Sequence, residues 1–251
     1  MCVDRVGAVA SPIAARRARY DFLYHVGLTS PCASPMAFIN WMHCAVPGTI
    51  TQVTERTAPS ADVLAALRAA TAGRHNALDR AMPLSHDAPT LDDYRDHLLI
   101  LRAWLAPLER WLARFGDGPQ DPARLAQVAR MPVLEQDLAH PATRAGGVAI
   151  PEIDVTALSH DAAYRWGLCY VIEGSQLGGA VLYRNLSGRL APHPLQYLGA
   201  GSTPGPRWQQ FLQALRASVR ESSDIALACA GAQRAFDDLL ARVPADAANA
   251  R

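Results

Sequence analysis

A histidine and an arginine share one face of a predicted helix, in a pattern that could bind a metal ion and an anionic group together. Arg68 precedes His75 by seven residues, or two helical turns, so the two lie on nearly the same side and roughly 10 Å apart along the axis. The face itself is set by steps of three and four residues through Leu64, Leu67, Thr71, His75, Leu78 and Met82. A histidine in this setting is usually a hydrogen-bonded core residue, so both roles stay open.

A second segment, Tyr164–Leu186, is apolar enough for a buried helix but contains Gly167, Gly174, Gly178 and Gly179. Each glycine in a helix interior costs up to about 1 kcal/mol relative to alanine. The last three form a bare stripe that lets another group approach the backbone closely. That group is either a second helix, which glycines alone favour, or a flat ligand.

Two motifs together resemble those of bacterial, biliverdin-producing haem oxygenases. Glu173–Gly179 reads EGSQLGG and is similar to the EGSxLGG motif of their distal helix. Leu67–Asp79 reads LRAATAGRHNALD and is similar to their proximal-helix segment. The resemblance runs from about Ser60 to about Val243, and it implies an all-α, haem oxygenase-like helical bundle with haem sandwiched between the proximal and distal helices.

The resemblance also implies how the haem is held. His75 falls on the proximal iron ligand, and Arg68 falls on a basic residue that faces a haem propionate. Arg216, in the segment FLQALR, falls on a basic residue that reaches the propionates from the second side. An arginine suits a carboxylate because its guanidinium can donate two parallel hydrogen bonds.

The distal wall implied by the resemblance consists of Gly174, Ser175, Gly178 and Gly179, which are the predicted catalytic set. Bare backbone leaves room for oxygen to reach a meso carbon of the ring. Many relatives have an aspartate where this chain has Ser175, so the proton relay is unassigned. The preceding residue, Glu173, could order either a helix end or a water network.

One further position differs from the wider family. Some relatives have a tyrosine where this chain has Cys169. The next residue is Tyr170, and whether it takes the place of that tyrosine stays open.

In the family, haem is both cofactor and substrate, and it is cleaved with molecular oxygen and electrons to biliverdin, carbon monoxide and ferrous iron. The implied partners are haem and an electron-donor protein, either a reductase or a ferredoxin. Iron release and supply of a bilin-binding photoreceptor are both open as the purpose.

Composition excludes several other functions. The formal net charge is +1 and no lysine is present, which argues against a nucleic-acid surface. No apolar run approaches the roughly 20 residues that a membrane span needs. The five cysteines form no CxxC pair, which favours a reducing compartment, the cytoplasm.

The helical pattern is clear only in part of the chain. We expect a poorly ordered extension over residues 1–56, one haem oxygenase-like domain over 57–243, and a frayed tail over 244–251. Within the domain, Thr90 and Asp93 predict a capping box. Further expected signals are a short helix capped by Asp121-Pro122, an N-cap at Ser159, a helix end at Ser187-Gly188, and helices from about Pro206 and from about Ser222 to Val243.

Two alternatives compete with a haem oxygenase. The first is a non-catalytic haem carrier or sensor on the same helical fold, which would also need His75 and an open pocket. The second is a related all-helical enzyme that binds no haem, in which the glycines serve helix packing and His75 is a buried core residue.

Overall fold

The computed structural model describes residues 62–147, 149–199 and 204–244, all of which belong to one compact unit of the chain. Every regular element among them is helical, which confirms the predicted all-α class. The expected extension over 1–56 lies outside the described residues, as do residues 245–251 of the tail expected over 244–251. The helices are α2 (Val63–Ala81), η3 (Pro83–Ser85), α3 (Leu91–Leu112), η4 (Gly118–Gln120), α4 (Met131–Leu138), α5 (Ala162–Leu186), α6 (Gln196–Gly199), α7 (Pro204–Ser218) and α8 (Ser222–Leu240).

The predicted apolar face of α2 is the one that is buried. The side chains of Leu64, Leu67, Thr71 and His75 all lie in the interior. The helix begins after Asp62, whose carboxylate accepts a hydrogen bond from the backbone N–H of Leu64 at 3.2 Å. This cap satisfies one of the backbone donors that a helix start leaves without a partner.

The capping box predicted for α3 is present in full. The Thr90 hydroxyl accepts from the Asp93 backbone N–H at 3.2 Å, and the Asp93 carboxylate accepts from the Thr90 N–H at 2.8 Å. His97 of this helix is buried. Burial lowers the pKa of His97 to about 4, so the ring is neutral in the fold.

The long helix α5 starts two residues later than the Ser159 cap predicted it would. Its N-cap is Asp161, which accepts from the Ala163 N–H at 2.7 Å, and the Ser159 hydroxyl accepts from the Asp161 N–H before the helix begins. An ionised aspartate at this position also interacts favourably with the helix dipole. The predicted end is confirmed, because the helix stops at Leu186 with Ser187 as its C-cap.

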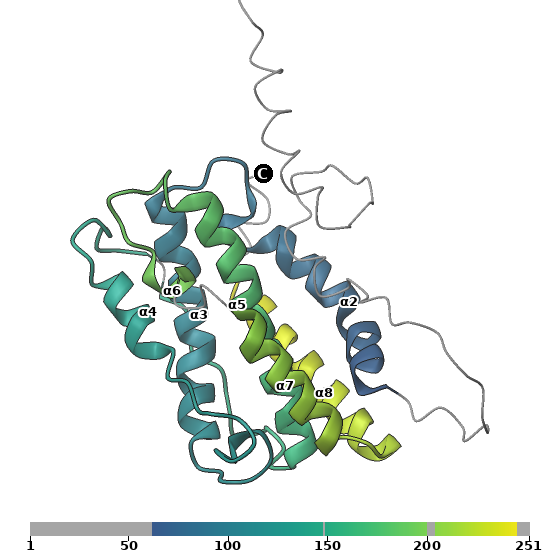
Figure 1. Cartoon of the computed structure of the whole chain (residues 1–251). Helices are drawn as coiled ribbons and strands as arrows, with labels where there is room; N and C mark the ends of the chain where they lie inside the picture. The colour runs from purple at the N-terminus through teal and green to yellow at the C-terminus, as the bar shows by residue number, and fades with distance from the viewer. Residues whose placement is uncertain (1–61, 148, 200–203, 245–251) are drawn as a thin grey trace, which may run out of the picture. The chain divides into compact units, whose positions relative to one another are not determined.

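The backbones of α5 and α8 approach each other closely at a pair of glycines. A Cβ on Gly167 would overlap the carbonyl oxygen of Ala228, and a Cβ on Gly231 would overlap that of Tyr164. Helix α8 packs extensively against both α5 and α2, as Figure 1 shows. The helix-packing role that glycines alone favoured is therefore the role of Gly167.

Helix α7 packs on α5 through aromatic rings. Trp208 lies 5.6 Å from Tyr170 between ring centroids and stacks on Phe211, which in turn contacts Trp166 at 5.5 Å. Such aromatic pairs contribute about 0.5–1.5 kcal/mol each beyond the area they bury. They fix α7 along the same helix that carries the distal glycines.

One local prediction was wrong. Residues 122–124 form a turn, and 126–130 have no regular structure, where a short helix was expected. The Asp121 carboxylate accepts from the Ala123 N–H at 2.9 Å and so closes a local turn. The short helix α6 was not predicted. None of the described helices is long and apolar enough to cross a membrane.

Candidate functional site

His75 lies beside a carboxylate one turn later on α2. The Nδ1 atom of His75 lies 3.1 Å from Oδ2 of Asp79, within ion-pair distance. A carboxylate next to Nδ1 favours the tautomer that has its proton on Nδ1 and its lone pair on Nε2. No described residue forms a hydrogen bond with Nε2. Nε2 is therefore the ring nitrogen that can bind a metal ion.

The surroundings of His75 keep this ring in place. The ring is buried and packs edge-on against Phe236 of α8, with centroids 5.8 Å apart. The adjacent Arg74 forms a bidentate ion pair with Asp237, at 2.7 and 3.1 Å, which ties α2 to α8 beside the histidine. Asp79 has a buried second oxygen, Oδ1, with no partner in the described part of the chain.

Arg68 is a cation without a carboxylate partner among the described residues. Its Nε is buried and forms no hydrogen bond there. A buried guanidinium nitrogen without an acceptor is costly, which makes Arg68 fit to receive an anionic group of a ligand. It lies on α2 at the predicted spacing from His75.

Tyr170 brings the proximal and distal helices into electrostatic contact. Burial raises the pKa of this α5 phenol to about 12, and the nearby positive charge of Arg68 partly opposes that rise. Cys169, which replaces the tyrosine of some relatives, points elsewhere: its thiol is buried and accepts from Gln120 at 3.5 Å. Burial raises the pKa of Cys169 to about 12, so it stays a neutral thiol.

The predicted distal residues do not all lie on one side of α5. Gly174 and Gly178 are about 40° apart around the helix, in line with Gly167. Gly179 lies on another side, where a Cβ would make ordinary contact with Leu198 of α6, at 3.8 Å. The Ser175 hydroxyl donates to the Ile172 carbonyl at 2.8 Å, so it is held by its own helix.

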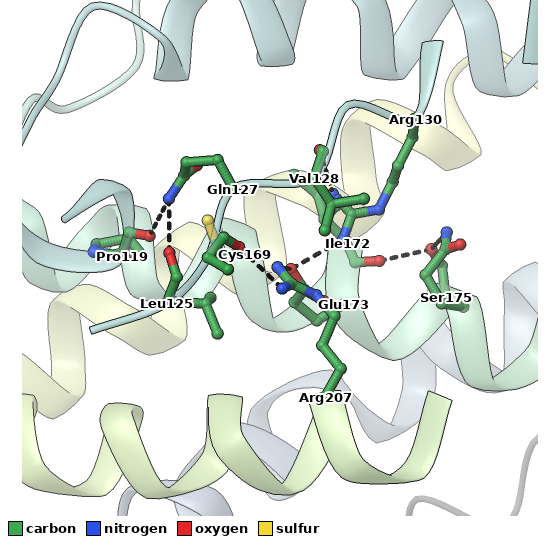
Figure 2. Close-up of polar contacts among 12 residues, drawn as sticks. Pro119, Leu125, Gln127, Val128, Arg130, Cys169, Ile172, Glu173, Ser175 and Arg207 are labelled. Carbon is green, nitrogen blue, oxygen red and sulfur yellow. Dashed lines mark hydrogen bonds and ion pairs between the residues drawn. The ribbon is translucent and has the colours of Figure 1, made fainter. Parts of the chain in front are cut away.

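Glu173, directly before Gly174, is buried and charged. Its Oε1 accepts from Arg130 Nη2 at 2.8 Å and from Arg207 Nη2 at 2.6 Å, and its Oε2 accepts from Arg207 Nε at 2.8 Å (Figure 2). Burial by itself would raise the pKa of this carboxyl, but the hydrogen bonds and charges of the two guanidiniums outweigh burial and hold the pKa below its usual value. Glu173 lies in the interior of α5 rather than at its end, and it joins this helix to Arg130 and Arg207; a role in a water network stays a prediction.

Arg216 belongs to the last turn of α7 and contacts the residue that caps the start of α2, rather than lying deep in the fold. It is half-exposed, and its Nε lies 3.3 Å from Oδ1 of Asp62, the residue that caps α2. Asp62 and Arg68 are six residues apart on one helix end, so Arg216 is placed at the same end as Arg68. A direct role in binding carboxylates stays a prediction.

Sequence reasoning missed three residues that shape this site. Asp79 stands four residues after His75, a spacing that would have indicated its contact with the ring. Arg130 and Arg207 gave no signal, because each reaches Glu173 from a distant part of the chain. In the described part of the chain, no group of three or more His, Cys, Asp or Glu side chains could hold a metal ion.

Comparison with known proteins bears on the whole of this region. The family model described as "Heme oxygenase" matches residues 61–241. A curated protein named "Heme oxygenase", from Xanthomonas campestris pv. campestris (strain 8004), is 34% identical over 145 residues, which make up 57% of this chain and 81% of that protein. The comparison with solved structures gives no match. The matched range spans α2, α5 and α8.

Proposed function

Because the chain belongs to the haem oxygenase family and has its haem-cleaving activity, we propose that it holds its substrate between His75 and the bare backbone of α5. The reaction consumes molecular oxygen and electrons and converts haem to biliverdin, carbon monoxide and ferrous iron. The proposal concerns which residues of this chain bind and orient the ring.

The observation that carries the proposal is the position of the His75 ring. Its Nδ1 lies 3.1 Å from the Asp79 carboxylate, which leaves Nε2 as the nitrogen to ligate iron. A neutral imidazole with a carboxylate behind it is a more basic ligand than an isolated one, and the carboxylate fixes its orientation. A single protein ligand is sufficient, because the macrocycle supplies four nitrogens.

Arg68 is proposed to bind a haem propionate. Its buried Nε lacks a protein acceptor in the described part of the chain, and it stands two turns from His75 along α2. An ion pair there would fix the rotation of the ring about the iron–histidine bond. That rotation decides which meso carbon lies beneath the distal wall. Arg216, near the same helix end, is proposed to contribute a second positive charge.

Gly174 and Gly178 are proposed to form the part of the wall that faces the ring. Their alignment on α5 leaves a stripe without side chains, which excludes bulk while keeping the backbone close. Gly179 lies on the side of α5 that faces α6, and because a Cβ there would make only ordinary contact with Leu198, the packing of α6 does not require this glycine. Ser175 is proposed to adjust the local course of the helix through its bond to Ile172.

The activity is tested by mixing the purified protein with hemin and then adding an electron donor such as a ferredoxin with its reductase. We expect a histidine-ligated Soret band that bleaches, a biliverdin absorbance, and released carbon monoxide. A stable Soret band with several donors would favour a haem carrier, which the comparisons do not favour.

We also propose an electron donor, a compartment and a use for the product. The proposed donor is a ferredoxin or a reductase. The proposed compartment is the cytoplasm, which is supported by the free thiols of Cys169 and Cys229. A bilin-binding photoreceptor is the proposed recipient of biliverdin, tested by coexpression of the enzyme with such an apoprotein and measurement of chromophore attachment.

A further inference from the structure

We infer that Glu173 is a positioning residue for the distal wall: through Arg130 and Arg207 it fixes where Gly174 lies relative to the bound ring. This inference rests on the function proposed above, because it assumes that the ring lies against this part of α5. Nothing in the sequence motif assigns such a role to the glutamate.

The first support is the number of elements that meet at this carboxylate. Arg207 belongs to α7, and Arg130 is the residue immediately before α4, so one side chain of α5 joins two separate parts of the fold (Figure 2). Arg207 binds it through two nitrogens, which fixes direction as well as distance. Glu173 is also 7% exposed, so water competes little for these bonds.

Both arginines are themselves held in place. The Arg207 Nη1 donates to the carbonyl of Ala126 at 2.8 Å, and the Arg130 Nη1 donates to that of Val128 at 3.3 Å. The backbone N–H of Arg130 donates to the Glu109 carboxylate on α3, at 3.0 Å. Glu173 is therefore attached to a fixed frame rather than to two mobile side chains.

The second support is that α5 needs an external anchor at this point. Three of its residues between 174 and 179 are glycines, which give the helix no side-chain packing on the stripe of Gly174 and Gly178. The Ser175 hydroxyl bonds back to Ile172, an interaction that tends to bend helices, and Gly/Ser pairs are common kink sites. A helix segment with so little side-chain packing keeps one position only if the residues next to it are fixed, and Glu173 directly precedes this segment.

The third support is the aromatic contact that runs beside the ion cluster. Arg207 is followed directly by Trp208, whose ring packs on Tyr170, one turn before Glu173. The ion pairs and the ring contact together hold the N-terminal half of α7 against one turn of α5. Movement of α7 would therefore move the distal glycines.

The test compares Glu173→Gln and Arg207→Lys with the wild-type protein and with Glu152→Gln. Glu173→Gln keeps the size and removes the charge, whereas Arg207→Lys keeps the charge and loses the bidentate bond. Glu152→Gln is the matched control, because Glu152 forms an ion pair of 2.7 Å with Arg110, but that pair is exposed and lies outside α5.

Five quantities are measured: the melting temperature without haem, the hemin affinity, the C–O stretching band of the ferrous carbon monoxide complex, the ratio of biliverdin isomers, and the turnover rate. We expect both variants to keep the hemin affinity and histidine-ligated Soret band, since His75 is untouched. Their C–O band should shift and broaden, the isomer ratio should change, and turnover should fall by roughly tenfold or more, because small misplacements cost that much. The control should match the wild type.

A purely structural role gives a different result: both variants melt at lower temperature, yet their C–O band and isomer ratio equal those of the wild type. That result overturns the inference while leaving the proposed function intact. If Glu173→Gln does not fold, Arg207→Lys alone decides between a positioning role and a purely structural role of Glu173. A wild-type protein that forms no biliverdin contradicts the proposed function, and the inference with it.

Discussion

The contact between α5 and α8 makes a quantitative prediction for Gly167→Ala. The added Cβ would overlap the Ala228 carbonyl oxygen and would lie 2.7 Å from its carbon and 2.8 Å from the Ala232 nitrogen. All three are backbone atoms, so no side-chain rotation relieves them and the helices must separate. Overpacking of this kind costs about 1–3 kcal/mol, occasionally more.

Because an added Cβ meets three backbone atoms at once, the upper end of that range applies. A gain in helix propensity of up to about 1 kcal/mol opposes that cost. About 3 kcal/mol less about 1 kcal/mol leaves an expected fall of about 2 kcal/mol in the free energy of unfolding of Gly167→Ala. For a protein of this size that corresponds to a fall in melting temperature of roughly 4–8 °C. Thermal melting followed by circular dichroism, with urea unfolding at 25 °C, measures both quantities.

Gly73→Ala is the matched control for this prediction. Gly73 is exposed in the middle of α2, and no described atom lies within 4 Å of an added Cβ. The same substitution should there raise stability by up to about 1 kcal/mol. Equal effects at the two positions, or a gain at Gly167, would refute the close approach of α5 and α8.

Three further predictions concern single side chains. Asp79→Asn should raise the haem midpoint potential and lower turnover about tenfold, because the carboxylate behind His75 is replaced by an uncharged amide. An unchanged potential in a redox titration would show that Asp79 does not act on the iron through His75. Arg68→Gln should weaken hemin binding about tenfold while leaving the binding of hemin dimethyl ester as it is in the wild type, because only free propionates can pair with the guanidinium; equal losses with both compounds in Soret titrations would count against this role. His97 has a pKa of about 4 in the folded state against about 6.5 in the unfolded state, so its contribution to folding stability is present above pH 6.5 and is lost as pH falls towards 4. Urea melts should therefore show about 2 kcal/mol less stability at pH 5 than at pH 7. The variant His97→Gln should lack this part of the pH dependence.

Local signals in the sequence were sufficient for the elements whose partners are close along the chain. The buried face of α2, with His75 on it, follows from a repeat of three and four residues, and the Thr90 capping box from two residues three apart. Both features depend on contacts within one helix. They could therefore be predicted without knowledge of the rest of the fold.

Features that depend on distant contacts could not be predicted in this way. Gly167 and Gly174 look alike in the sequence, and only the position of α8 shows that Gly167 serves helix packing. The ion cluster at Glu173 joins residues 34 and 43 positions apart, so no spacing rule indicates it. His97 is a polar residue next to Asp96, and only the packing of the fold shows that its own helical face turns inward.

The central claim is that the imidazole of His75 ligates the iron of a haem lying against α5. Its most direct test is a hemin titration of His75→Ala followed by ultraviolet–visible and resonance Raman spectra, with and without added imidazole. We expect the variant to lose the iron–histidine stretching band, and free imidazole, occupying the vacated space, to restore the histidine-type spectrum. A variant whose iron–histidine band equals that of the wild type without added imidazole would place the ligand elsewhere and contradict the assignment of His75.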